Sequence, residues 1–482
     1  MHLTKLFPAI IASFVLYSCS TGPQQREITK VDSPNLEMNW LQTDVSKSAD
    51  GFLLKNQSSA IASKFQVRNF EFTAKLKTTS GAEGILVFAA PDIKSAEKGY
   101  SIKINNSDYS EGNPQKTGSL LLIRNNFVRT ATNDKWFNLS VIVKGNHIKV
   151  TVDDKTVSEY NEPANLQRTG DLADKVLAKG SLMIQKSNPE GELVIGEMSV
   201  LQLADQLKDT LAVAEPDSLM RVVDLLNEQK FPLIDFHCHL KGGLTMDQVC
   251  QHARDNGYNY GVAAICGLKF PVTSDSTLNA YLDGISKEPV FKAMQCEGRE
   301  WVTLFTPAAV ARFDYIFTDA MTWTDNQGRR LRLWIPAETF VDDEQQFMDM
   351  LVGKIEAIIG NEPVDIYVNP TFLPAKIAAD YDRLWTPERM DRVIKVLKNN
   401  DVAFEINARY KIPSIAFLKR AKEAGVKFSF GTNNTTNTDL NRLEYCLKAI
   451  KEVGLTADDM FLPRPANDKK VMKAGLPSKI TG

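Results

Sequence analysis

The chain has 482 residues, of which 43% are hydrophobic and 24% charged, and its formal net charge is −2 at pH 7. This length is too great for one hydrophobic core, so we expect two or three domains. The near-neutral charge gives no electrostatic reason to expect an anionic membrane surface as a partner, and we expect no nucleic acid partner.

The first residues have the pattern of an export signal. Lys5 precedes a short apolar run, and residues 16–19 read Leu-Tyr-Ser-Cys, which is similar to a bacterial lipobox despite the unusual Tyr17. We predict that residues 1–18 are a lipoprotein signal peptide, that Cys19 carries the lipid, and that residues 19–32 form a tether. The mature chain would be a membrane-anchored lipoprotein of the bacterial cell envelope. Plain secretion after an ordinary cleavage is the alternative.

Residues 33–202 consist of short segments in which apolar and polar residues alternate, separated by turn-forming Gly, Asn and Asp. Alternation of this kind is typical of half-buried antiparallel strands. The predicted strands cover residues 70–77, 84–89, 99–104, 118–123, 136–144 and 147–152. No long helical pattern interrupts them. We therefore predict an all-β sandwich of two sheets.

Several short motifs of this domain occur in a known order. They are residues 70–72, 99–100, 116–119, 134–138, 180–185 and 194–201. In this order they resemble the concanavalin-like (laminin-G-like) domain of the 3-keto-disaccharide hydrolase family. The family usually has an acid after the Gly-Tyr pair, whereas this chain has Ser101 there and Lys103 beyond it. The resemblance implies carbohydrate binding. A domain that only spaces or shields its neighbour is the alternative.

Residues 203–230 connect the two domains. Apolar residues recur at helical spacing in residues 203–213 and again in residues 216–226, where Pro216 stands at a plausible helix start. We expect two short helices here.

The segment 231–240 reads Phe-Pro-Leu-Ile-Asp-Phe-His-Cys-His-Leu and has the residues of a buried strand. Because side chains alternate between the faces of a strand, Asp235, His237 and His239 are expected to point the same way. Two imidazoles and a carboxylate at this spacing can hold one transition metal. Chance occurrence of His-x-His on an exposed strand is the alternative.

Residues 231–482 alternate predicted strands with amphipathic helices, which indicates a parallel α/β fold. The predicted strands cover residues 232–238, 260–266, 291–297, 314–319, 331–336, 364–369, 402–407 and 426–431. No Gly-x-Gly-x-x-Gly turn is present, which favours a TIM-like barrel over a dinucleotide-binding sheet. Polar residues follow most strands, where barrel chemistry collects. They include Lys269, Glu297, Glu300, Asp319, Asn369, Glu405, Asn407 and Asn433.

Motifs along this domain have the order of a known superfamily. They are residues 234–239, 298–300, 365–370, 404–407, 430–434 and 440–447. They resemble the polymerase-and-histidinol-phosphatase (PHP) superfamily of metal-dependent hydrolases, which implies a distorted seven-stranded barrel with up to three metals. Asn369, Met321 and Thr435 stand where the superfamily has histidines, Asn433 replaces its late Asp, and Lys269 lies near another expected His. The resemblance therefore implies a reduced site.

We predict one or two divalent ions of the Zn, Mn or Mg class in this reduced site. The expected ligands are Asp235, His237, His239, Glu300 and Asp319. The expected catalytic residues are Lys241, Lys269, Glu297 and Arg299, the cations serving to bind an anion or stabilise an oxyanion. The expected substrate-binding residues are Asn369, Glu405, Asn407 and Asn433.

Three functions remain open. The first, which the sandwich resemblance favours, is a metal-dependent hydrolase or lyase that acts on a carbohydrate derivative, a small molecule or an oligosaccharide, at the cell envelope. The second is a metal-dependent phosphoesterase. The third is a non-catalytic carbohydrate-binding lipoprotein.

Overall fold

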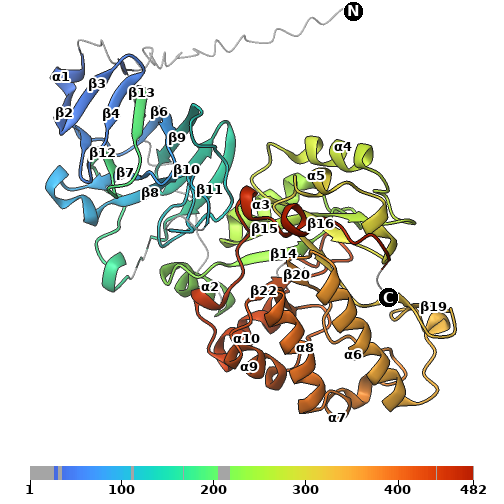
Figure 1. Ribbon diagram of the computed structural model, residues 1–482. Coiled ribbons are helices and arrows are strands. Elements are labelled where there is room, and N and C mark those ends of the chain that lie inside the picture. Colours follow the sequence, from blue (N-terminus) through green and yellow to red (C-terminus); the bar gives the residue numbers. More distant parts are fainter. Residues whose placement is uncertain are drawn as a thin grey trace, which may run out of the picture.

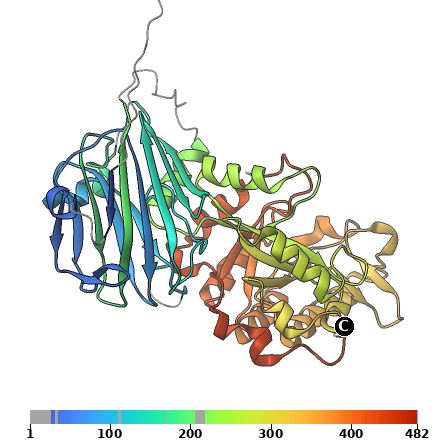
Figure 2. The same ribbon diagram turned by 90° about the horizontal axis from the view of Figure 1, so that it is seen from above.

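The computed structural model describes residues 27–30, 35–109, 113–164, 166, 168–204, 218–440 and 442–480. They form two bodies that lie side by side, an antiparallel β-sandwich and an α/β barrel (Figures 1 and 2). Cys19, the predicted signal peptide and the first predicted connector helix lie outside the described residues. Within the described part of the chain, no helix is long and apolar enough to cross a membrane.

The sandwich confirms the predicted all-β fold of the first half. One sheet has the order β11-β10-β9-β6-β13-β4-β3, with β1 also paired to β13, and the other has the order β2-β5-β12-β7-β8. The strands are β1 (Glu27–Lys30), β2 (Trp40–Thr43), β3 (Val45–Ser48), β4 (Gly51–Leu54), β5 (Ala60–Ser63), β6 (Phe70–Thr78), β7 (Glu83–Ala90), β8 (Tyr100–Asn105), β9 (Phe137–Lys144), β10 (His147–Val152), β11 (Lys155–Asn161), β12 (Ser181–Lys186) and β13 (Leu193–Gln202), and helix α1 (Asn35–Asn39) precedes β2.

Alternation along the strands places the core between the sheets. In β6, Phe70, Phe72, Ala74 and Leu76 are buried while the residues between them are more exposed. The predicted strand at residues 118–123 is wrong. These residues form a tight turn in which Leu120 bridges to strand β8 and back to Arg124, so the alternation there reflects a buried loop.

Seven parallel strands close the barrel of the second half, as the sequence predicted. In order they are β14 (Ile234–Cys238), β15 (Asn259–Cys266), β16 (Phe291–Cys296), β17 (Tyr315–Thr318), β20 (Ile366–Tyr367), β21 (Ala403–Asn407) and β22 (Phe428–Gly431), and β22 pairs with β14. The predicted strand at 331–336 is not part of the barrel. Arg330–Arg332 (β19) pairs only with Thr322–Thr324 (β18) in a hairpin.

Helices surround the barrel (Figure 1). They are α2 (Ser218–Glu228), α3 (Met246–Asn256), α4 (Asp275–Ile285), α5 (Pro307–Val310), α6 (Glu344–Asn361), α7 (Tyr381–Leu384), α8 (Pro387–Asn399), α9 (Ile415–Glu423), α10 (Glu444–Val453) and α11 (Lys470–Ala474). Thr245 and Thr386 cap α3 and α8 through their hydroxyl oxygens, because each accepts an otherwise unpaired amide of the first turn.

A loop of the sandwich closes one end of the barrel. Phe127 and Val128 are buried in one apolar cluster with the first residues of several barrel strands. These barrel residues include Ile234, Phe291, Tyr315, Ile366 and Ala403. Because the strands are parallel, this end lies opposite the ends where catalytic groups collect in barrels. The sandwich thus completes the core of its neighbour.

Polar contacts fix the same loop. The side chain of Asn259, at the start of β15, accepts the amide of Phe127 at 2.9 Å and donates to the carbonyl of Asn125 at 2.9 Å. Asn125 also donates two hydrogen bonds to Asn227, one to its side-chain oxygen at 3.0 Å and one to its carbonyl oxygen at 2.7 Å. All of these groups are buried, so an imperfect fit would leave polar atoms unpaired. The two bodies therefore form one unit.

Candidate functional site

Buried polar side chains gather at the carboxyl ends of the barrel strands. They are His237 on β14, His239 just beyond it, Glu297 after β16, Asp319 after β17, Asn369 after β20, Glu405 and Asn407 on β21, and Asn433 after β22. We call these eight residues the mouth cluster. Such concentration of ionisable groups in a buried site marks a functional centre more often than a structural one.

His237 is held by Glu405. The Nδ1 atom of His237 lies 2.6 Å from Oε1 of Glu405. The other oxygen of Glu405 accepts the amide of Asn369 at 2.6 Å and the side-chain amide of Asn407 at 2.8 Å. Because Oε2 of Glu405 already accepts two donors and Oε1 faces the ring nitrogen, we assign Glu405 as the acceptor and the imidazole proton to Nδ1. The Nε2 atom of His237 is buried and has no hydrogen-bond partner.

Glycine makes this pairing possible. A Cβ atom at Gly431 would lie 2.0 Å from Oε1 of Glu405 and 2.7 Å from Cβ of His237. Both distances are below any real contact, so a larger residue on β22 would push the pair apart. Gly431 is a site residue that the sequence analysis did not identify, although it precedes the polar residues 432–434.

His239 is oriented by the main chain. Its Nδ1 atom lies 3.1 Å from the carbonyl oxygen of Ala263, and its amide and carbonyl bond the side chain of Asn434 at 2.8 and 2.9 Å. Burial, with help from His237 and Lys241, holds the pKa of His239 well below its usual value. Its imidazole is therefore neutral, and with the proton assigned to Nδ1 its Nε2 atom is left as an acceptor.

Glu297 and Asp319 are two further carboxyl groups of the mouth cluster, and Asp319 lies within electrostatic range of His237. Burial, and to a smaller extent the charge of Asp319, raise the pKa of Glu297 to about 8 against the lowering effects of Arg299 and Lys241. Burial also raises the pKa of Asp319. Oε1 of Glu297 accepts Nε2 of Gln295 at 2.7 Å, and Oε2 is buried without a partner. At neutral pH Glu297 and Asp319 together therefore carry less than two negative charges.

Three asparagines connect the cluster. The side-chain amides of Asn407 and Asn433 donate to Oδ1 of Asn369 at 3.0 and 2.7 Å. Asn369 in turn approaches Oδ2 of Asp319 at 3.4 Å. Asn369 and Asn433 both have φ of 45°, a left-handed conformation that Asn tolerates better than most residues. Their role as substrate ligands stays a prediction. In the structure they orient each other.

The structure places four predicted site residues away from the open part of this cluster. Asp235 accepts the amide of His237 and both the amide and the hydroxyl of Thr432. Since its oxygens have these donors, we expect Asp235 to hold β14 against β22. Glu300 pairs with Arg330 of the β18–β19 hairpin at 2.6 Å.

Arg299 and Lys269 also lie in other surroundings. The guanidinium of Arg299 is buried and donates to both oxygens of Glu362 at 2.9 Å. The ammonium of Lys269 is exposed, and it adds to the stronger effect of Arg332 in lowering the pKa of Glu338. Lys241, in contrast, lowers the pKa of Glu297, and burial lowers its own pKa. Arg299 also acts on the mouth cluster, because it donates to the carbonyl oxygen of Asp319 at 3.2 Å and lowers the pKa of Glu297. Of the predicted catalytic residues, the structure thus brings Lys241, Glu297 and Arg299 within electrostatic range of one another and places Lys269 apart.

The mouth cluster has part of the chemistry of a metal site. In both histidines a fixed acceptor takes Nδ1, as in metal centres where Nε2 is the ligand atom. Nε2 of His237 and Oε2 of Glu297 have no hydrogen-bond partner, and each has a lone pair that a metal ion could use. Across the described ranges, however, no three His, Cys, Asp or Glu side chains are arranged to hold a metal ion. The two histidines are therefore a partial ligand set, which the described residues do not complete in this arrangement.

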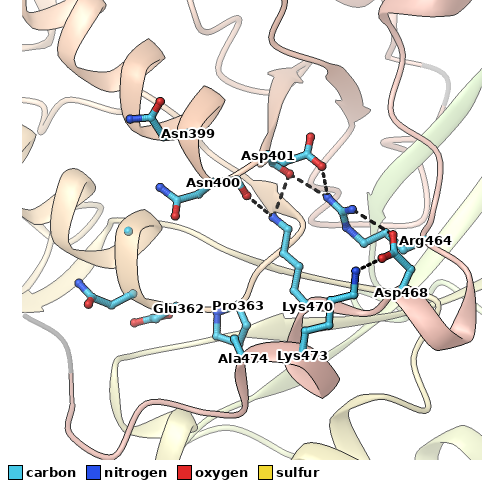
Figure 3. A pocket seen from close by; sticks show the side chains of 12 residues that line it. Glu362, Pro363, Asn399, Asn400, Asp401, Arg464, Asp468, Lys470, Lys473 and Ala474 are labelled. Carbon is cyan, nitrogen blue, oxygen red and sulfur yellow. Dashed lines mark hydrogen bonds and ion pairs between the residues drawn. The ribbon is translucent and has the colours of Figure 1, made fainter.

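A hollow of about 340 Å³ lies at the end of the barrel opposite the mouth cluster (Figure 3). Figure 3 shows Lys470 pointing to the carbonyl oxygens of Asn400 and Asp401, at 2.8 and 2.9 Å, while Arg464 reaches the carboxylate of Asp401. Burial lowers the pKa of Lys470 to about 8. These cations satisfy carbonyl groups just beyond the end of α8, so we assign this hollow a structural role.

The raised pKa of Glu297 predicts how stability depends on pH. Because the folded-state pKa of about 8 lies above the ordinary 4.5, this group stabilises the fold fully below pH 4.5, and that contribution is lost as pH rises through about 8. Glu297→Gln stays neutral at every pH. Its midpoint of thermal unfolding should therefore fall less than that of the wild type between about pH 6 and about pH 9. The exposed Glu452→Gln serves as control, and equal slopes for all three proteins would contradict the prediction.

Comparison with known proteins relates both halves to other families. Residues 28–194 match the family model described as a 3-keto-alpha-glucoside-1,2-lyase-like domain, which confirms the resemblance seen in the sequence. A Parabacteroides distasonis protein assigned as a glycosyl hydrolase is 18% identical, and the match covers 37% of this chain and 100% of that chain with a TM-score of 0.31.

For the second half, histidinol phosphate phosphatase from Lactococcus lactis, solved with zinc, L-histidinol and phosphate, is 13% identical; the match covers 47% of this chain and 95% of that chain, with a TM-score of 0.35. No significant match is found among curated proteins.

Proposed function

We propose that this chain is a hydrolase or lyase that acts on a carbohydrate derivative, with its chemistry at the mouth cluster of the barrel. The observation that carries the proposal is the orientation of His237. Glu405 fixes its Nδ1 atom at 2.6 Å, and its buried Nε2 atom is left without a partner beside the Glu297–Asp319 acid pair. A purely structural histidine has no reason to leave a buried nitrogen unpaired.

We infer that one divalent ion of the Zn, Mn or Mg class binds here. His237 and His239 would hold it through Nε2, with Asp319 as the third protein ligand. A bound divalent ion supplies an activated water molecule at neutral pH and polarises an oxygen of the substrate. The residues around it have separate tasks. Glu297, whose Oε2 atom is unpaired, is placed to exchange a proton with the substrate, and Lys241 is placed to bind developing negative charge.

Support for a sugar substrate comes from the sandwich. The matched family is described as a 3-keto-alpha-glucoside-1,2-lyase-like domain, and the match covers residues 28–194. Because the sandwich and the barrel share a buried interface, we infer that they act on the same class of substrate. Anchoring in the bacterial cell envelope through a lipid on Cys19 is part of the proposal.

Metal quantification tests the proposal directly. We expect about one ion per chain in the wild type, and an affinity more than about 100-fold weaker in His237→Ala and in His239→Ala, because loss of a ligand atom costs more than loss of a group that only orients a ligand. His252→Ala is the matched control, since His252 lies on α3, where its Nδ1 bonds the hydroxyl of Tyr260 at 2.8 Å. Metal far below one ion per chain that does not change in the two variants would overturn the metal proposal.

A substrate screen completes the test. The wild type should cleave oxidised or plain glycosides, and His237→Ala should lose this turnover while His252→Ala keeps it. Turnover of a general phosphodiester instead, lost in the same variant, would identify a phosphoesterase. Glycan binding without any turnover would identify a binding protein.

A further inference from the structure

A hollow of about 410 Å³ opens beside the mouth cluster, at the same end of the barrel. Its lining comes from the loops that follow β20 and β21, and includes Phe372, Leu373, Tyr381, Asp382, Tyr410 and Lys411. This volume lies in the range of about 300–1,000 Å³ that is usual for sites of small ligands. The site residues discussed above do not line it.

Two aromatic rings form one wall of this hollow. The rings of Phe372 and Tyr410 meet edge to face with their centroids 4.9 Å apart, and both side chains are partly exposed. The backbone fixes each of them. Thr371, with φ of 63°, turns the chain before Phe372, and the amide of Tyr410 donates to Oδ1 of Asn407 at 2.9 Å. Since Asn407 belongs to the mouth cluster, its hydrogen bond to Tyr410 connects this wall of the hollow to the cluster.

Tyr410 lies between the hollow and the mouth cluster. Burial raises its pKa, Arg409 lowers it, and Asp319 and Glu405 raise it. Both carboxyl groups belong to the mouth cluster, so the phenol lies within electrostatic range of that cluster while its ring lines the hollow. A ligand resting on the ring would extend towards the acid pair.

The chemistry of the lining indicates the ligand. Aromatic faces and edges pack against the C–H faces of sugar rings. Asp382 and Lys411, both exposed at the hollow, offer one acceptor and one donor group to hydroxyls. Because the two charges are of opposite sign, the lining suits a neutral polyhydroxylated ring better than an anion such as a phosphate.

We propose that this hollow is a subsite for one neutral sugar ring of a glycoside, adjacent to the reacting bond. The proposal rests on the proposed function for what happens at that bond, but binding in the hollow does not require turnover. It assigns Phe372 and Tyr410 as the binding platform.

Saturation-transfer NMR with methyl α-D-glucopyranoside and maltose on the full chain tests the subsite. Transfer to ring C–H protons is expected in the wild type and in Tyr410→Phe, which keeps the ring. Phe372→Ala and Tyr410→Ala should weaken binding about 3- to 10-fold, the amount that loss of an aromatic contact gives. Met472→Ala removes an exposed apolar side chain on α11, at the other end of the barrel, and should bind as the wild type does.

The outcomes separate the subsite from the proposed function. His237→Ala should keep binding, because His237 does not line the hollow. Aromatic-dependent binding in a chain that turns over no glycoside would uphold the subsite and refute the enzyme. Turnover with an unchanged KM in Phe372→Ala and Tyr410→Ala, or no transfer in the wild type, would overturn the subsite. Unfolding curves of each variant show that the fold is retained.

Discussion

Glu405→Gln is expected to move the proton of His237 from Nδ1 to Nε2 and thereby remove its ability to bind a metal or accept a proton. The substituted amide has the volume of the carboxylate but only one acceptor oxygen. Asn369 and Asn407 already donate to Oε2, so that oxygen stays with them. The new NH2 group then faces Nδ1 of His237, which must become the acceptor. We expect metal affinity to fall about 10- to 100-fold.

Imidazole ¹⁵N chemical shifts measure the tautomer of His237 directly. Glu362→Gln is the matched control, because Glu362 is also a buried carboxylate, bound by Arg299 at 2.9 Å and by the indole of Trp301 at 2.8 Å. That variant should lose stability without changing the tautomer of His237. A proton that stays on Nδ1 in Glu405→Gln, with metal affinity within about two-fold of the wild type, would refute the role given to Glu405.

The sequence predicted most barrel strands because their local pattern and their tertiary role agree. Ile234, Phe236 and Cys238 are apolar and alternate with Asp235 and His237, and the segment folds as the buried strand β14. The failure at residues 331–336 shows the limit of the pattern. Leu331 and Leu333 are buried, but Leu331 pairs with Trp323 in a hairpin, because seven strands already close the barrel. Alternation of apolar and polar residues indicates an extended segment, but it does not show with which strand the segment pairs.

For the site, the sequence identified residue types but not their partners. Glu300 and Arg299 are neighbours in a motif, yet they bind Arg330 and Glu362, which lie 30 and 63 positions further along the chain. Asp235 binds Thr432, 197 positions away. Such pairings follow from the closure of the barrel, and no spacing rule within one segment encodes them.

The asparagines explain why the site differs from a site with several metals. Asn369 and Asn433 stand where the resembled superfamily has a histidine and an aspartate. In this chain Asn433 donates to Asn369 at 2.7 Å, and Asn369 is also bound by Asn407. Neutral amides that satisfy one another cost little to bury, whereas unpaired carboxylates would be costly. The amide oxygen and nitrogen atoms of this network are thus occupied by one another.

The contact between the sandwich and the barrel could not be predicted from the sequence either. Phe127 and Val128 lie between two predicted strands and have the appearance of a loop, but both are buried against the starts of the barrel strands. An apolar pair in a loop normally packs on its own domain. Only the position of the loop, fixed by Asn259 and Asn227, gives these side chains their partner.

Phe127→Ala is therefore expected to destabilise the barrel, although the substitution lies in the sandwich. Loss of a fully buried Phe costs about 3–5 kcal/mol, because the cavity it leaves cannot collapse between fixed strands. Hydrogen exchange should accelerate in peptides that cover β14 and β16, whose first residues contact the same cluster, and stay unchanged in β6 and β9.

Phe340→Ala is the control for that experiment, since Phe340 is an aromatic residue of the barrel domain that is 37% exposed and covered by Arg329. It should leave exchange in β14 and β16 unaltered. If Phe127→Ala accelerated exchange only in the sandwich, the loop would stabilise only its own domain, and the prediction would be wrong. If it accelerated exchange in the barrel, the sandwich would be part of the barrel's core, and neither half could be studied alone as a model of the whole.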